Sequence, residues 1–212
     1  MIFRLHPDTL DFPPAELAEE DGLLAIEGDL STQRLLKAYS LGIFPWYSED
    51  TPILWYSPHE RFVLWPDEIK ISKSMRQVLK SGKFSVTEDN AFERVISACA
   101  NAARKDQAGT WILDEIQKAY IKLHKLGHAH SIEVWCEDKL VGGLYGVKYN
   151  NVFCGESMFS TISNASKTAL VWLCLNKGYH LIDCQVHTEH LENMGARFIS
   201  REEYMRYLMK LS

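Results

Sequence analysis

The chain has 212 residues, a mass of 24.4 kDa and a net charge of −5, with 46% hydrophobic and 24% charged residues, as in an ordinary globular protein with one large or two modest domains. No apolar run reaches the roughly 18 residues of a membrane span, and the first residues, MIFRLHPDTLDFPP, lack the apolar core of a signal peptide. The five cysteines form no CxxC pair and are odd in number, so we expect reduced thiols in a cytoplasmic protein without a membrane partner.

The first sixty-odd residues are rich in proline and aromatic residues, and part of this segment is strongly acidic. Between Asp8 and Asp29 there are eight acids and no lysine or arginine. One helix is expected, with Ser31 as its N-cap and Gly42 as its stop. Short strands are expected at 53–56 and 62–65. This pattern predicts a small N-terminal α/β domain over residues 1–63 and a second domain over 64–212.

The second domain begins with a basic segment. Residues 69–87 carry five bases and no acid. Four of the bases are spaced by three, four and three residues, which places them on one face of a helix: Lys73, Arg76, Lys80 and Lys83. Such a stripe could contact several phosphates of a nucleic acid, and the alternative is a solvated surface helix.

The remaining pattern predicts alternating helices and strands. A strand at 84–87 and helices at 90–103 and 113–126 precede three strands that are joined by short polar turns, at 129–136, 140–149 and 152–159. A helix at 164–176, a strand at 181–186, a helical turn at 188–193, a strand at 198–199 and a final helix from 201 follow. This order predicts an α+β fold with a mixed, largely antiparallel sheet. It resembles the GNAT-type acyltransferase fold, in which the strand after the long helix splays from its neighbour and opens a cleft.

An acid and an amide lie two residues apart on the strand at 181–186. Because side chains alternate along a strand, Asp183 and Gln185 are expected on the same side. Such a pair could hold and deprotonate an amine, and the alternative is a satisfied polar pair at a sheet edge. Glu156 lies within the apolar strand at 152–159, so it must be paired, hydrogen-bonded or functional.

Other candidate residues keep two interpretations open. The glycines of 142–146 lie inside a strand, where they serve packing or form the wall of a site. Trp46 and Trp111 follow turns and could stack a base or pack in the core. The histidine cluster at 124–130 lacks further ligands at metal-binding spacing, so no metal is expected. The chain also contains no GxSxG, HExxH or GxxxxGK[ST] motif.

Ten segments in order resemble one known family. They are FPP, GLLAIEGDLS, LLKAYSLGIFPWYS, PILWYSPHERFVLWP, GTWI, LHKLGHAHSIEVW, LVGGLYGV, FCGESMFS, NASKTAL and LIDCQV. The resemblance as a whole extends from residue 12 to about residue 201. Together they resemble the leucyl/phenylalanyl-tRNA–protein transferase family. The resemblance implies a family-specific N-terminal domain and a GNAT-like catalytic domain. It also implies transfer of Leu, Phe or Met from aminoacyl-tRNA to proteins that begin with Arg or Lys, which marks them for degradation.

The resemblance also implies roles for individual residues, with no cofactor because the aminoacyl ester is already activated. Gln185 is expected to accept a hydrogen bond from the incoming amine, Asp183 to orient that amide and receive the proton, and Glu156 to help recognise the ester or the cationic acceptor. The 3′-terminal adenosine is expected to contact Trp46 and Trp111, with Tyr39 and Tyr120 nearby. The aminoacyl side chain is expected in a pocket formed by Leu144, Phe153 and Ile182. The basic stripe becomes the expected contact of the tRNA acceptor stem.

Two departures from the family pattern and two alternative functions remain. Leu173 stands where an aromatic residue can occur, and the chain ends at Ser212 without the longer tail of some members. An acetyltransferase that uses acetyl-CoA would need a glycine-rich pyrophosphate loop, but residues 160–166 contain no glycine. A binding module for basic N-termini is the other alternative. We expect the protein to be a monomer.

Overall fold

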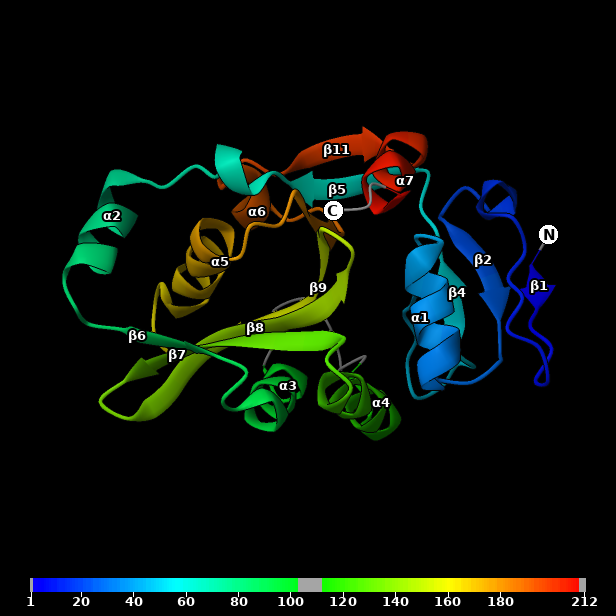
Figure 1. Cartoon of the computed structure of the whole chain (residues 1–212), viewed down its shortest axis with the longest axis horizontal. Helices are drawn as coiled ribbons and strands as arrows, with labels where there is room; N and C mark the ends of the chain where they lie inside the picture. Colours follow the sequence, from blue (N-terminus) through cyan, green and yellow to red (C-terminus); the bar gives the residue numbers. More distant parts are fainter. Residues whose placement is uncertain (1, 103–111, 210–212) are drawn as a thin grey trace.

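The computed structural model describes residues 2–102 and 112–209, which form two sheets that lie next to each other (Figure 1). The smaller, N-terminal sheet has the strand order β1-β2-β4-β3. Its strands are β1 (Phe3–Arg4), β2 (Leu23–Ile26), β3 (Phe44–Pro45) and β4 (Leu54–Tyr56), and a short 3-10 helix, η1 (Ala15–Leu17), precedes β2. No helix among the described residues is long and apolar enough to cross a bilayer.

One helix, α1 (Thr32–Ser40), packs on the N-terminal sheet, and its ends follow the sequence signals. The Ser31 side chain accepts a hydrogen bond from the backbone N–H of Arg34, as an N-cap does. Gly42 ends the helix with a φ of 69°, a left-handed conformation that favours glycine. The predicted cap and stop are therefore confirmed.

The larger sheet has seven strands in the order β11-β5-β10-β9-β8-β7-β6. β6 to β9 pair antiparallel in sequence, β10 pairs parallel to β9, and β5 pairs antiparallel to both β10 and β11. The strands are β5 (Glu60–Leu64), β6 (Ser85–Glu88), β7 (Ala129–Cys136), β8 (Lys139–Tyr149), β9 (Val152–Ser160), β10 (Leu181–Gln185) and β11 (Arg197–Ser200). The predicted α+β class with a mixed, largely antiparallel sheet is confirmed.

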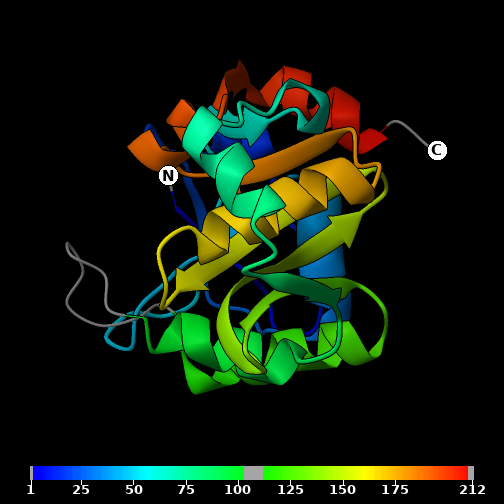
Figure 2. The same cartoon turned by 90° about the vertical axis from the view of Figure 1, so that its left-hand side faces the viewer.

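Helices cover both faces of this sheet (Figures 1 and 2). α3 (Phe92–Ala100) and α4 (Asp114–Lys125) pack on one face, and α5 (Ala165–Asn176) crosses the other. The helix α2 (Lys73–Lys80) lies at the end of the molecule opposite the N-terminal sheet, and three short elements, η2 (Pro66–Glu68), α6 (Glu189–Asn193) and α7 (Arg201–Met209), lie near β5 and β11. Two hydrophobic cores result, one on each face of the sheet.

The parallel pair β9–β10 is paired over only part of its length. Leu181, Ile182 and Asp183 pair with Val152, Phe153 and Cys154, and there the pairing ends, although β9 continues to Ser160. β10 also carries an irregularity between Asp183 and Gln185, where Gln185 has a φ of 60°. The two strands therefore splay apart beyond Asp183, as expected for a GNAT-like domain, and the splay creates space beside β9.

The glycines of β8 serve close packing. A Cβ on Gly142 would lie 2.5 Å from the Cβ of Ala165 on α5, and one on Gly146 would lie 2.2 Å from the carbonyl oxygen of Cys154. Because real Cβ atoms do not approach so closely, any side chain here would push α5 or β9 away from β8. Of the two interpretations left open by the sequence, the structure supports packing at these two positions.

A short connection between the two sheets, residues 57–59, is held on both sides. The N–H of Ser57 donates to the Gly22 carbonyl at 2.8 Å, and its carbonyl accepts from the Arg201 guanidinium at 2.8 Å. The His59 carbonyl accepts from the N–H of Arg201 at 2.9 Å. The connection is thus bonded to the N-terminal sheet and to the start of α7.

Candidate active site

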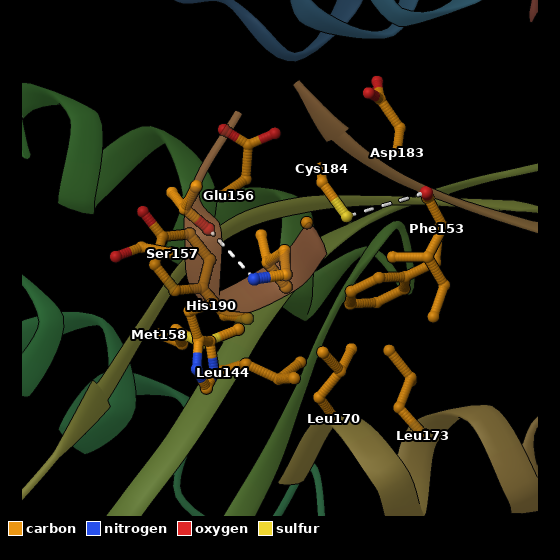
Figure 3. A pocket seen from close by; sticks show the side chains of 15 residues that line it. Leu144, Phe153, Glu156, Ser157, Met158, Leu170, Leu173, Asp183, Cys184 and His190 are labelled. Carbon is orange, nitrogen blue, oxygen red and sulfur yellow. Dashed lines mark hydrogen bonds between the residues drawn. The ribbon is translucent and has the colours of Figure 1, made fainter. Parts of the chain in front are cut away.

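A pocket of about 300 Å³ lies in the splay between β9 and β10 (Figure 3). Most of its wall is apolar, and it is formed by β8, β9, α5, β10 and α6. The lining includes the three residues expected to hold the aminoacyl side chain, Leu144, Phe153 and Ile182, together with Met158, Leu170 and Leu173. The structure therefore brings the predicted pocket residues together, and it adds Leu173, the position at which this chain departs from the family pattern.

Glu156 lies in the wall of this pocket, which Asp183 also lines, and is 7% exposed. Its Oε1 accepts hydrogen bonds from the Tyr39 hydroxyl at 2.7 Å and from Gln185 Nε2 at 3.1 Å. Its Oε2 accepts from the Tyr120 hydroxyl at 3.3 Å, and the two tyrosine hydroxyls lie 2.5 Å apart. Residues from α1, α4, β9 and β10 thus converge on one buried carboxylate.

Burial is the main influence on the acidity of Glu156. It raises the pKa of the carboxyl group from 4.5 to about 7, and the nearby Asp183 charge acts in the same direction. The hydrogen bonds from Tyr39, Gln185 and Tyr120 oppose this shift, because they stabilise the charged form. A carboxyl group with such a pKa can gain or lose a proton near neutral pH, which is typical of groups that transfer protons.

Asp183 is fully buried, and its oxygens are occupied by other protein groups. Oδ1 accepts from Arg61 Nε at 3.2 Å and from the Gln185 N–H at 2.9 Å. Oδ2 accepts from Arg61 Nη2 and from the Tyr204 hydroxyl, the latter at 2.9 Å. The ion pair with Arg61 makes this carboxylate a fixed structural group on the side of β10 that faces β5 and α7.

The strict alternation expected at 181–186 does not extend to Gln185. Because the register shifts after Asp183, the Gln185 side chain reaches Glu156, whereas the Asp183 side chain reaches Arg61. The Gln185 amide is therefore oriented by Glu156 instead of by the Asp183 side chain. The irregularity involves one residue in a left-handed conformation, which the apolar pattern of the strand does not reveal.

The remaining predicted residues have varied surroundings. Trp46 is 36% exposed and lies 5.8 Å from the Tyr56 ring, whereas Tyr39 and Tyr120 are buried and direct their hydroxyls to Glu156. Trp111 lies outside the described residues. The basic residues are all exposed, but α2 ends at Lys80, so the predicted common helix face holds for Lys73, Arg76 and Lys80 and is wrong for Lys83.

Among the residues that the structure describes, one group of side chains has the spacing of metal ligands. Glu88, Asp89 and His130 place ligand atoms within 4.8 Å of one another. However, Asp89 already pairs with His130 at 2.7 Å, and Glu88 pairs with Lys177 at 2.7 Å. These pairs satisfy the charges of the group, so we assign no metal to it.

Comparison with known proteins identifies the family. A family model described as leucyl/phenylalanyl-tRNA protein transferase matches residues 63–209, and a model of the N-terminal domain of the same transferase matches residues 28–59. The chain belongs to this family. The aminoacyltransferase family predicted from the ten sequence segments is therefore confirmed.

Three relatives with the name leucyl/phenylalanyl-tRNA–protein transferase illustrate the similarity. The protein of Syntrophus aciditrophicus is 58% identical, over 94% of this chain and 84% of its own length. The protein of Flavobacterium johnsoniae is 54% identical, over 98% of this chain and 99% of its own length. The protein of Escherichia coli O7:K1 is 50% identical, over 99% of this chain and 91% of its own length. This chain thus matches relatives of the transferase family over nearly their whole length.

Two solved structures resemble this chain at low sequence identity. A GCN5-related N-acetyltransferase from Kribbella flavida has a TM-score of 0.39 and 8% identity, over 76% of this chain and 58% of that chain. A functionally unknown protein from Staphylococcus epidermidis has a TM-score of 0.46 and 9% identity, over 84% and 68%. Membership of the transferase family rests on the sequence matches.

Arg61 and Tyr204 hold the Asp183 carboxylate next to this candidate site, and neither was identified from the sequence. Arg61 is a charged residue within the apolar strand ERFVL, a pattern that signals a buried ion pair. Its partner is more than a hundred residues away, so the pattern alone does not reveal it. Tyr204 belongs to the amphipathic helix α7, where an inward tyrosine looks like an ordinary core residue.

Proposed function

We propose that the pocket beside Glu156 is where this chain transfers leucine or phenylalanine from aminoacyl-tRNA to the α-amine of a protein that begins with Arg or Lys. One observation carries the assignment of the site. A buried carboxyl group with a pKa of about 7 lies in the wall of an apolar pocket, within the splay of two parallel strands. Membership of the transferase family supports the reaction.

The aminoacyl side chain occupies the apolar pocket in this proposal. Leu144, Phe153 and Ile182 form walls without polar side chains, which suit a leucyl or phenylalanyl group. An apolar pocket separates substrates that differ by one methylene by only about 1–3 kcal/mol. The pocket should therefore also accept methionine, whose side chain is flexible and of similar polarity.

Glu156 acts as the proton acceptor. A protein α-amine has a pKa of about 7.7–8.0, so most of it is protonated at neutral pH. The pKa of Glu156 lies within about one unit of this range, which is suitable for removing the proton, and a general base of this kind contributes about 10²–10⁴-fold to the rate. The Gln185 Nε2 group donates to Glu156. The Gln185 Oε1 atom is then available to accept a hydrogen bond from an approaching amine.

The bond changes follow directly. The neutral amine nitrogen attacks the ester carbonyl carbon, and the bond between that carbon and the ribose oxygen of the tRNA breaks. Glu156 first takes the proton of the ammonium form and releases it to solvent. During the attack it takes a second proton from the same nitrogen and passes it to this ribose oxygen, which leaves a neutral amide and a free hydroxyl group. Asp183 holds Gln185 in place, because its carboxylate accepts the backbone N–H of Gln185. The charge of Asp183 is itself paired with Arg61.

The proposal also includes contacts with the tRNA. Trp46 presents a partly exposed ring, and we retain Trp46, Trp111, Tyr39 and Tyr120 as the residues that contact the 3′-terminal adenosine. The basic residues of α2, with Lys83 just beyond its end, are retained as the acceptor-stem contact.

We also retain a domain boundary after residue 63, although the larger sheet already begins at Glu60. We propose a cytoplasmic monomer whose products are marked for degradation.

The decisive experiment follows radiolabelled phenylalanine from charged tRNA to a peptide that begins with Arg. Glu156→Gln keeps the shape of the side chain and removes the base, so kcat should fall about 10²-fold or more, whereas KM for the charged tRNA should change by less than about twofold. Glu133→Gln is the matched control, because Glu133 is also a buried glutamate that accepts from Ser131 and Thr87 on the far strands. A Glu156→Gln enzyme with nearly full kcat would exclude Glu156 as the base.

A further inference from the structure

Arg61 lies at the junction of three parts of the fold. It belongs to β5 and is 2% exposed. Its guanidinium group forms the ion pair with Asp183 and donates from Nη1 to the Gly42 carbonyl at 2.7 Å. It also lies between two aromatic rings, 4.8 Å from the centroid of Phe44 and 4.5 Å from that of Tyr204. A single side chain therefore connects the N-terminal sheet, β10 and α7.

One line of contacts leads from Arg61 to Glu156 through β10. Arg61 fixes Asp183, and Asp183 Oδ1 accepts the backbone N–H of Gln185 at 2.9 Å. This contact holds the irregular end of β10, where Gln185 has a φ of 60°, a value that non-glycine residues seldom adopt. In this conformation the Gln185 amide donates to Glu156.

A second line leads from Arg61 through the N-terminal domain. Gly42, whose carbonyl accepts from Arg61, donates its own N–H to the Tyr39 carbonyl at 3.1 Å at the end of α1. The Tyr39 hydroxyl donates to Glu156 at 2.7 Å. Both groups that donate to Glu156 Oε1 are therefore tied to the same guanidinium group.

We propose that Arg61 is a positioning residue of the transferase, which holds Tyr39 and Gln185 against Glu156 and compensates the charge of Asp183 behind them. The proposal rests on the assignment of Glu156 as the proton acceptor. Arg61 is suited to this task because a planar guanidinium can donate to a carboxylate and a carbonyl at fixed angles at the same time. Lysine carries the same charge but lacks this fork.

The direction of the effect on Glu156 follows from its surroundings. The ionisable groups around its carboxylate come from four elements, namely Tyr39 of α1, Tyr120 of α4, Cys154 of β9 and Asp183 of β10, with Arg61 of β5 behind Asp183. Weakening the donors, or exposing Glu156 to more of the Asp183 charge, raises the pKa of Glu156. Removing the Asp183 charge lowers it.

Two substitutions should therefore move the pKa of Glu156 in opposite directions. Arg61→Lys should raise it by about one unit, because it weakens hydrogen bonds that favour the charged form. Asp183→Asn keeps an oxygen for the Gln185 N–H but removes the negative charge, so it should lower the pKa of Glu156 by a similar amount. Damage to the fold alone does not produce opposite shifts.

The experiment combines two measurements on the full-length protein. Carbon-13 NMR of labelled glutamate side chains, assigned with Glu156→Gln, follows the titration of Glu156 directly. The pH dependence of kcat, at saturating charged tRNA and peptide, should show its acid limb shifted upward in Arg61→Lys and downward in Asp183→Asn, with kcat at neutral pH lowered about tenfold for Arg61→Lys. Arg197→Lys is the control, because Arg197 pairs with Glu68 at the surface.

The outcomes separate the two proposals. Shifted NMR titrations with an unchanged pH profile of kcat would show that Arg61 holds Tyr39 and Gln185 against Glu156, but they would exclude Glu156 as the base and so overturn a catalytic purpose of this positioning. An unchanged Glu156 titration in folded Arg61→Lys overturns the role of Arg61. If circular dichroism shows that Arg61→Lys does not fold, Phe44→Leu serves in its place. This variant removes one ring from the guanidinium group and should raise the pKa of Glu156 by a smaller amount. No shift in Phe44→Leu would then overturn the proposal.

Discussion

Replacement of Glu156 by glutamine should stabilise the protein at alkaline pH and leave its stability nearly unchanged at acid pH. In the folded protein burial raises the pKa of Glu156 from 4.5 to about 7. A carboxyl group with a raised pKa contributes its full stability below pH 4.5, and this contribution is lost as the pH rises through 7, because the folded protein must then bury the charge. Glutamine is neutral throughout.

The size of the effect follows from the shift. A difference of about 2.5 units corresponds to about 3 kcal/mol in the free energy of unfolding at pH 8 and above, at 1.36 kcal/mol per unit. For a protein of this length each kcal/mol changes Tm by about 2–4 °C, so Glu156→Gln should melt several degrees above the natural protein at pH 8.5.

Urea unfolding at pH 4.5, 6, 7 and 8.5, chosen to bracket the two pKa values, measures this difference for both proteins. The advantage of the glutamine variant should be absent at the lowest pH and should grow mainly between pH 5 and 8. A stability difference that does not change with pH would refute the raised pKa, and with it the reason for naming Glu156 as the base.

Two further predictions concern substrate binding. Leu173→Ala enlarges the pocket, so kcat/KM for leucyl-tRNA should fall about tenfold or more. The value for phenylalanyl-tRNA should fall less, because the larger ring fills the space. Equal losses for the two substrates would exclude Leu173 as a wall of the aminoacyl site. Charge reversal at Lys73, Arg76 and Lys80 should weaken tRNA binding and reduce the slope of log K against log salt by about 2 or more. Reversal of the exposed Lys139, the first residue of β8, is the control, and an unchanged slope in the triple variant would remove α2 from the tRNA contact.

Local signals in the sequence predicted most of the elements. The apolar period of residues 113–126 and the polar turns between residues 129 and 159 correspond to α4 and to the meander β7–β9. These features depend on neighbours in the chain, so they can be read without tertiary information. The apolar character of Leu144, Phe153 and Ile182 was equally visible, but their role in one pocket came from the resemblance to a family.

The contacts that organise the site were less accessible. Gln185 leaves the alternation of its strand because the Asp183 carboxylate binds its N–H, and Asp183 is itself fixed by Arg61 from β5. A tertiary ion pair thus decides a local backbone conformation, and a period-two pattern does not include such an effect. The donors to Glu156 come from α1, α4 and β10, so their convergence depends on the assembly of both sheets.

The connection at residues 57–59 has a consequence for how the substrates meet. A swing of the N-terminal sheet relative to the larger sheet would strain the hydrogen bonds that Arg201 donates to the Ser57 and His59 carbonyls. The two sheets of the enzyme should therefore keep the same relative orientation when the substrates bind. We therefore expect the two substrates, and not the N-terminal sheet, to supply the movement that brings ester and amine together.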